Sequence, residues 1–138
     1  MTTGGDVIYG GASGALTRLA NGSNGQVLTS QGGTSAPIWA NPGTPGTQTI
    51  SGNYTILPAD ANSVLFINTS AARNITLPTP TSGFQITLKD KSGLAQTNNI
   101  TVIRAGSEQI EGVAASKICQ TNWGSWKFIS DGTNWFMI

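Results

Sequence analysis

The stretch SWKFISDGTNWFMI, residues 125–138, carries the strongest structural signal in the sequence. Two short runs rich in aromatic and β-branched residues flank Asp131-Gly132, a dipeptide typical of tight turns between antiparallel strands. In the first run Trp126 and Phe128 fall on one face, with the two-residue period of a strand. The stretch therefore predicts a β-hairpin made of residues 125–130 and 135–138, with apolar side chains on both faces.

Similar runs recur upstream at intervals of about ten residues, bounded by Gly, Pro, Asn and Asp. In FQITLK, for example, Phe84, Ile86 and Leu88 alternate with polar residues, which predicts a strand with one buried face. Because no helical period separates the runs, the pattern indicates an all-β domain, an antiparallel β-sandwich or a barrel-like sheet. The expected strands are residues 49–57, 63–68, 74–77, 84–89, 99–104, 125–130 and 135–138.

Charged residues are scarce and scattered through the chain. The 138 residues include seven basic and six acidic ones, and the charged fraction is 9% where soluble domains average about 25%. Such a surface is either neutral and polar or shared with another chain. We expect no nucleic-acid binding, because no basic face exists, and no membrane insertion, because no apolar window approaches the length of a membrane span, about 18 residues.

Two Pro-Gly pairs, Pro42-Gly43 and Pro45-Gly46, mark a change in composition. Proline and glycine at this density interrupt any regular element, so we interpret residues 42–48 as a stiff linker. The predicted organisation is an arm over residues 1–41 and a β domain over residues 49–138.

The predicted arm combines many glycines with isolated apolar residues. Ordering so much glycine costs conformational entropy, and apolar residues spaced in this way are too few for a core. We expect an extended arm that docks on another protein surface. The candidate anchoring residues are Ile8, Tyr9, Leu16, Leu19, Val27, Leu28, Ile38 and Trp39.

Enzymatic chemistry has little support in the sequence. The absence of histidine excludes a Ser-His-Asp triad and His-ligated metal sites. Glu108 and Glu111 could form the carboxylate pair of a glycosidase, but turn and surface roles are expected for the acidic residues, as for Asp90 and Asp131 in turns. We predict no enzyme activity, no metal and no cofactor. The single Cys119 cannot form an intrachain disulfide and is expected to be buried.

The aromatic residues near the C-terminus allow two interpretations. Aromatic faces and amide groups together bind neutral glycans, so a surface cluster here would be a possible glycan site. Burial in the core or in a subunit interface is favoured, because aromatic side chains cover much area in a small domain. The residues concerned are Asn122, Trp123, Trp126, Asn134 and Trp135.

The N-terminal third, GDVIYGGASGALTRLANGSNGQVLTSQGGTSAPIWA, resembles a segment of tailed-bacteriophage virion proteins with the pattern G-D-[IL]-[IL]-Y…L…L…G…G-x-V-L…P-x-W. That segment occurs in tail fibres, head fibres and related spikes. The β domain is similar to another phage fibre module through ITLPT, LKDKSGLAQTNNITV, QIEG and GSWKFISDGTNWFMI. Together the two modules cover nearly the whole chain.

The resemblance implies a homotrimer, because such fibres and spikes are generally threefold and wind the arms of three chains about one axis. The eight arm residues named above would then also pack the trimer. The short chain favours a head fibre, a capsid decoration protein or a small tail spike over a long tail fibre. The implied partners are the chain itself and phage capsid or tail proteins, in a virion assembled in the host bacterial cytoplasm. The alternative is a tail-fibre adhesin that binds host-surface carbohydrate.

Overall fold

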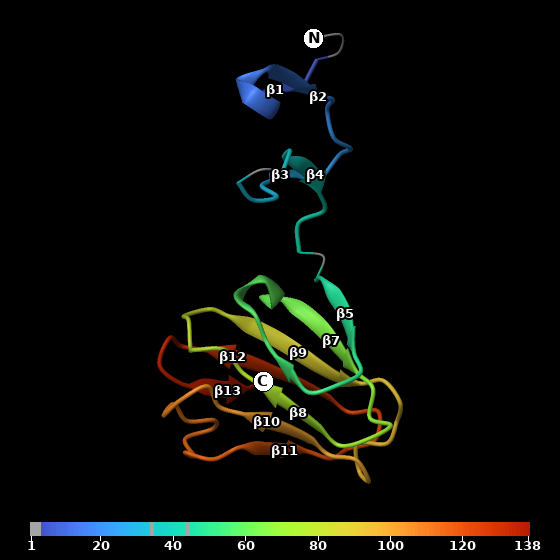
Figure 1. Cartoon of the computed structure of the whole chain (residues 1–138), viewed down its shortest axis with the longest axis vertical. Helices are drawn as coiled ribbons and strands as arrows, with labels where there is room; N and C mark the ends of the chain where they lie inside the picture. The colour runs from blue at the N-terminus through green and yellow to red at the C-terminus, as the bar shows by residue number, and fades with distance from the viewer. Residues whose placement is uncertain (1–3, 34, 44) are drawn as a thin grey trace. The chain divides into compact units, whose positions relative to one another are not determined.

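The computed structural model describes residues 4–33, 35–43 and 45–138. The chain divides into two compact units, Met1–Thr44 and Pro45–Ile138, and the division falls between the two Pro-Gly pairs (Figure 1). Nearly all regular structure in the described residues is strand, which confirms the all-β class. No helix in this part of the chain is both long enough and apolar enough to cross a membrane.

The N-terminal unit, called the arm below, contains two antiparallel hairpins (Figure 1). In the first hairpin a loop with a short 3-10 turn joins the strands, and Ser13 and Gly14 adopt left-handed φ angles of 56° and 76°. The strands are β1 (Val7–Gly10), β2 (Leu16–Leu19), β3 (Val27–Thr29) and β4 (Ile38–Ala40), with η1 (Ala12–Gly14) between β1 and β2. The sequence predicts an extended arm without strands for residues 1–41, so the two hairpins correct that prediction.

The C-terminal unit, the β domain, forms two sheets. One is five-stranded in the order β13-β12-β9-β7-β5, and the other is four-stranded in the order β11-β10-β8-β6. The elements are β5 (Thr47–Ile50), β6 (Tyr54–Thr55), η2 (Pro58–Asp60), β7 (Ser63–Ile67), β8 (Arg73–Thr76), β9 (Gln85–Asp90), β10 (Ile100–Ile103), β11 (Lys117–Cys119), β12 (Ser125–Ser130) and β13 (Trp135–Met137).

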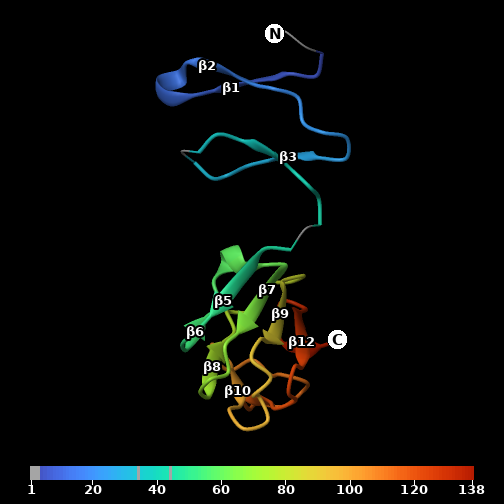
Figure 2. The same cartoon turned by 90° about the vertical axis from the view of Figure 1, so that its right-hand side faces the viewer.

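From β5 to β10 the chain alternates between the two sheets (Figures 1 and 2). Strands β5, β7 and β9 are parallel neighbours in one sheet, and β6, β8 and β10 are parallel neighbours in the other. The segment therefore winds as a coil of three turns, each turn contributing one strand to each sheet. The strand register places residues of the same type side by side in successive turns, as in the pairs Ile50–Ile67 and Leu65–Leu88.

The coil corrects the predicted antiparallel arrangement. Only β11, β12 and β13 pair antiparallel with their neighbours in the β domain, so both sheets are mixed. The predicted strand at residues 49–57 is interrupted, because the chain crosses from β5 to β6 at residues 51–53. Strand β11 was not predicted, and β5 begins at Thr47, inside the predicted linker.

One hydrophobic core lies between the two sheets. The five-stranded sheet supplies Ile67 and Phe128, and the four-stranded sheet supplies Ile75 and Val102, all fully buried. The predicted buried face of β9 is confirmed, since Ile86 and Leu88 belong to this core together with Phe84 just before the strand. The remaining core residues are Ile50, Ile56, Leu65, Leu77, Ile100, Ile110, Cys119 and Trp135.

The C-terminal hairpin is also confirmed, because β12 and β13 pair antiparallel. The loop spans residues 131–134, longer than the two-residue turn suggested by Asp131-Gly132. One carboxylate oxygen of Asp131 accepts hydrogen bonds from the backbone N–H groups of Thr133 and Asn134, both 2.8 Å long. These two bonds lower the pKa of the Asp131 carboxyl.

Candidate interaction surfaces

The arm presents apolar side chains to solvent. When backbone and side chain are counted together, none of its described residues is buried, and five of the eight candidate anchors are 43–83% exposed. Pairing of Ile8 with Arg18 and of Gly10 with Leu16 places Ile8 and Leu16 on one face of the first hairpin. The exposed anchors are Ile8, Leu16, Val27, Leu28 and Ile38, while Tyr9, Leu19 and Trp39 are half-buried.

A buried carboxylate holds the first hairpin. The side chain of Asp6 is fully enclosed and lies 2.8 Å from Nε of Arg18, which is on the opposite strand. The same carboxylate accepts a hydrogen bond of 3.2 Å from the backbone N–H of Asn21. Asp6 therefore connects both strands to the segment that follows them.

Trp39 connects the two hairpins of the arm. Its indole N–H donates a 2.7 Å hydrogen bond to the backbone carbonyl of Ala20, and its ring lies against Gly22. A Cβ atom at Gly22 would come within 2.6 Å of the ring, so only glycine allows this approach. Trp39 is thus used inside the arm, and the five exposed anchors remain available to a partner.

The five candidate glycan-contact residues do not form one surface. Trp135 is fully buried, with its ring edge-on to Phe84 at 5.7 Å between centroids, and Trp126 is half-buried against the core. Trp123 precedes β12 and Asn134 follows it, so the two residues lie at opposite ends of that strand. A strand of this length spans about 20 Å. Trp135 has the packing role that sequence analysis favoured.

Trp123 is the exposed aromatic residue of this set, with 64% of its surface accessible. It has a left-handed φ angle of 59°, which is uncommon for a residue with a large side chain. The ring lies against Gly93, where a Cβ atom would come within 2.2 Å of it. The ammonium of Lys89 lies 5.8 Å from the ring centroid, within the range of a cation–π interaction.

Asp90 fixes the loop that carries Trp123. Its carboxylate is fully buried and accepts a 2.7 Å hydrogen bond from the Thr69 hydroxyl and a 3.0 Å bond from the backbone N–H of Trp123. Backbone N–H groups of Ser92, Gly93 and Ala95 donate three more bonds, at 3.0–3.1 Å. Burial alone would raise the pKa of Asp90, but these hydrogen bonds outweigh it and hold the pKa below its ordinary value.

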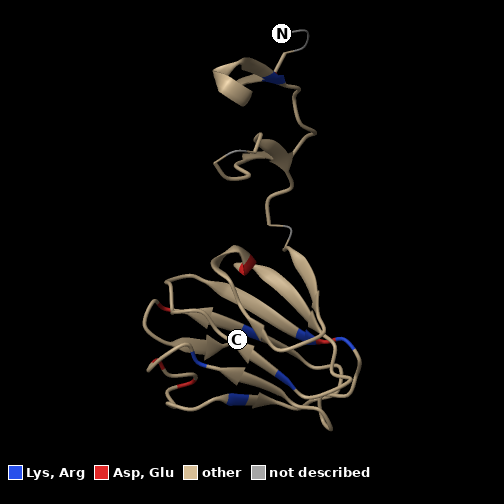
Figure 3. Cartoon of the chain, in the orientation of Figure 1, with Lys and Arg blue, Asp and Glu red and all other residues tan. Residues whose placement is uncertain are grey.

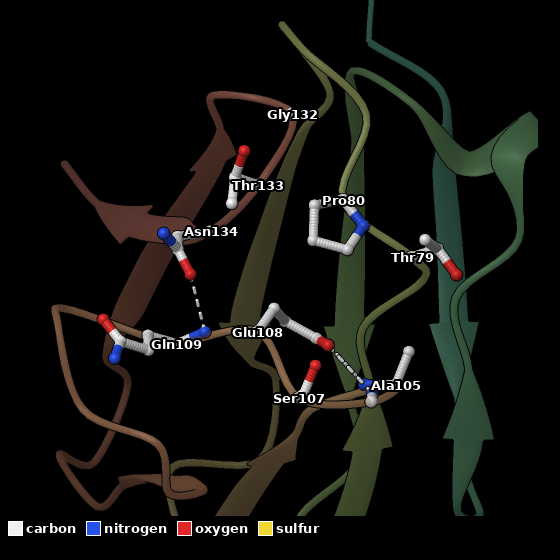
Figure 4. A pocket seen from close by; sticks show the side chains of 10 residues that line it. Thr79, Pro80, Ala105, Ser107, Glu108, Gln109, Gly132, Thr133 and Asn134 are labelled. Carbon is white, nitrogen blue, oxygen red and sulfur yellow. Dashed lines mark hydrogen bonds between the residues drawn. The ribbon is translucent and has the colours of Figure 1, made fainter.

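A polar pocket of about 600 Å³ lies at the other end of β12 (Figure 4). Glu108 points along its wall and accepts hydrogen bonds from the backbone N–H groups of Ala105 and Gly106, at 2.5 and 2.9 Å. Asn134 accepts a 2.8 Å bond from the backbone N–H of Gln109 (Figure 4). None of the described residues that line the pocket is aromatic. The Glu108 carboxylate and the Asn134 amide oxygen are used to hold the loops of the pocket in place.

The remaining candidate groups are also held by the fold. Glu111 accepts a hydrogen bond from the backbone N–H of Met137, so each member of the proposed carboxylate pair has a structural partner. The described residues contain no group of three metal-ligating side chains. Cys119 is buried, as predicted, and burial raises the pKa of its thiol to about 12.

The sequence matches no protein-family model, and no curated protein is significantly similar to it.

Proposed function

We propose that the protein is a structural component of a tailed-phage virion, a short homotrimeric fibre, spike or decoration protein attached through its arm. The resemblance of both modules to phage fibre proteins supports the assignment to a virion. The observation that carries the mechanical part is the arm's exposed apolar surface, since no apolar residue of the described arm is buried.

The physical argument starts from the marginal stability of isolated hairpins. A two-stranded hairpin has little stability in water without a further surface to cover its apolar side chains. The five exposed anchors gain that cover if arms from several chains pack together, or if the arm docks on a particle protein. The β domain has its own core and would project from the attachment point.

The first test is the mass of the intact protein in solution, by sedimentation or light scattering over a concentration series. The proposal expects a mass near three chains and an arm that resists protease. Leu16→Ser, at an exposed anchor, is expected to weaken assembly by at least tenfold, as loss of an apolar contact worth about 1.4 kcal/mol or more would do. The matched control is Leu57→Ser, because Leu57 is an exposed leucine of the β domain.

A single-chain mass at every concentration, with a protease-sensitive arm, would contradict self-trimerisation. Loss of assembly in Leu57→Ser as well as in Leu16→Ser would remove the arm's special role. Trp39→Ala tests a different step, because loss of its hydrogen bond to Ala20 should separate the two hairpins. It is expected to weaken trimer formation or particle attachment by a few kcal/mol per subunit, about the cost of truncating a packed aromatic residue.

Virion location is tested separately. Mass spectrometry of purified particles assembled from the genome that encodes this chain should detect it in fixed proportion to the capsid protein. Its absence from particles in which the other structural proteins are found would refute the virion assignment.

The second candidate function is a host-surface glycan adhesin. The observation in its favour is Trp123, an aromatic side chain that is 64% exposed and fixed by its backbone to the buried Asp90. An exposed aromatic face of this kind is a suitable platform for a sugar ring. The expected result is weak, millimolar glycan binding that Trp123→Ala removes while the oligomeric state is unchanged.

A further inference from the structure

We propose that Trp123 and Lys89 form a binding site for an acidic saccharide, in which a sugar ring lies on the indole and its carboxylate meets the ammonium. This inference rests on the adhesin candidate above and specifies its ligand class. The site combines an aromatic face with the Lys89 ammonium, which is in no ion pair among the described residues and lies 5.8 Å from the centroid of that face.

The indole is held in place before any ligand arrives. The backbone N–H of Trp123 donates to the buried Asp90 carboxylate, its carbonyl accepts a hydrogen bond from Lys89, and Gly93 supports the ring. A left-handed φ angle at a large exposed side chain is a strained arrangement that the surrounding contacts must maintain. A ring fixed in this way loses little conformational freedom on binding.

The charge of Lys89 is available to an anion. Its ammonium donates to two neutral acceptors, the backbone carbonyls of Asp90 and Trp123. The single ion pair found among the described residues joins Arg18 to Asp6 in the arm, so no carboxylate oxygen lies within salt-bridge distance of the Lys89 ammonium. An ammonium has three N–H donors, and two are used here, which leaves one for a ligand.

The end of the β domain that carries Trp123 is basic. Lys91 and Arg73 lie with Lys89 where β9 ends and β8 begins, and the acidic residue in these segments, Asp90, is enclosed by its five hydrogen bonds. Figure 3 shows how Lys and Arg (blue) and Asp and Glu (red) are distributed along the ribbon. The acidic residues of the segments that follow β10 and β12 lie at the opposite end of those strands; they are Glu108, Glu111 and Asp131. This separation favours an anionic ligand at the Trp123 end.

Asn122, which precedes Trp123 in the chain, supplies a further exposed polar group. Its amide oxygen accepts a 2.8 Å hydrogen bond from the backbone N–H of Gln96, which fixes the orientation of the side chain. The amide nitrogen then points away from that bond and can donate to a sugar hydroxyl. An aromatic face, an ammonium and an amide are together suited to a hexuronic or sialic acid.

The experiment follows the indole N–H signals of the ¹⁵N-labelled full-length protein by NMR during titration. The acidic probes are tetragalacturonate, a hyaluronan tetrasaccharide and 3′-sialyllactose, and the neutral probe is maltotetraose. Trp123 is assigned by the loss of its signal in Trp123→Phe, and the buried Trp135 serves as an internal reference. At least one acidic probe should shift the Trp123 signal with a millimolar dissociation constant, about fivefold or more tighter than maltotetraose and weaker at high salt.

Variants separate the role of the ring from the role of the charge. Trp123→Ala should weaken binding about tenfold or more, as expected for a central aromatic contact, whereas Trp123→Phe retains part of it. Lys89→Met should remove the preference for acidic probes, and Lys89→Arg should keep it. The matched control is Lys127→Met, another lysine of the same sheet, which should bind like the wild type.

Two results would overturn the proposal. One is that every acidic probe binds as weakly as maltotetraose or more weakly. The other is an equal loss of binding in Lys89→Met and Lys127→Met. Sedimentation of each variant in parallel distinguishes this failure from failure of the fibre proposal, because the trimer is expected to persist in all of them.

Discussion

The arm and the β domain are both built from short strands, but they differ in where their apolar side chains lie. Leu65 of the β domain is completely buried, whereas Leu16 of the arm is 83% exposed. The β domain stacks its strands in successive turns and closes two sheets on one core, whereas each arm hairpin has a single layer. Strand formation alone therefore does not make a region independently stable; a second layer is needed.

The largest expected effect comes from breaking the core of the β domain. Leu65→Ala should lower the free energy of unfolding by about 2–5 kcal/mol, because it removes buried methyl groups and leaves a cavity between the sheets. Urea unfolding followed by tryptophan fluorescence measures the change. A loss below about 1 kcal/mol would mean that the two sheets are not closely packed at this position.

Asp90 provides the next effect, at the end of the β domain. Asp90→Asn should cost about 2–4 kcal/mol at pH 7, because the buried network loses its charge and at least one acceptor. The folded pKa of Asp90 is lowered, so its contribution is fully present above the unfolded pKa, about 3.9, and is lost as pH falls through the folded value.

Unfolding curves of the wild type and of Asp90→Asn at several pH values measure this dependence. The stability difference between them should stay constant from neutral pH down to about pH 5 and shrink below about pH 4. A difference that grows as the pH falls would contradict the assigned network.

Cys119 tests the closure of the four-stranded sheet with a smaller effect. Its thiol is buried and its pKa is raised to about 12, so it should react with a thiol reagent at pH 8 only through opening of the sheet edge at β11. Cys119→Ala should cost about 1 kcal/mol, as for removal of a small buried side chain. Rapid labelling of the native protein would show that β11 is not a stable edge.

The smallest expected effect lies in the arm. Leu16→Ala should change the unfolding free energy of the β domain by less than about 0.5 kcal/mol, because the side chain is exposed in the single chain. Its effect should appear in assembly instead, which hydrogen exchange of the arm amides can follow in dilute and concentrated samples. A loss of β-domain stability similar to that of Leu65→Ala would erase the contrast between the two regions.

Much of the β domain could be predicted from local pattern. The alternation around Ile86 and Leu88 and the turn residues at Asp131-Gly132 were enough to place strands, because both signals act within a few residues. The parallel coil was not predictable in this way. Whether a turn such as residues 51–53 leads back along the same sheet or across to the other depends on distant partners.

The candidate surfaces were less predictable for the same reason. Trp123 and Trp135 occur in similar contexts, each beside an asparagine, yet one is exposed and the other is completely buried. Asp90 was interpreted as an ordinary turn residue, but its carboxylate also binds Thr69 and Trp123, which are distant in sequence. The arm strands were missed because each has four or fewer residues among many glycines.

The stacked turns of the coil also bear on how the length of such a protein could vary. Each turn adds one strand to each sheet at a spacing of about 4.8 Å. Each turn pairs mainly with the turns directly before and after it. Duplication of one turn would therefore lengthen the β domain in fixed steps while the antiparallel cap of β11, β12 and β13 stays the same. The length of the β domain along the coil is therefore proportional to its number of turns.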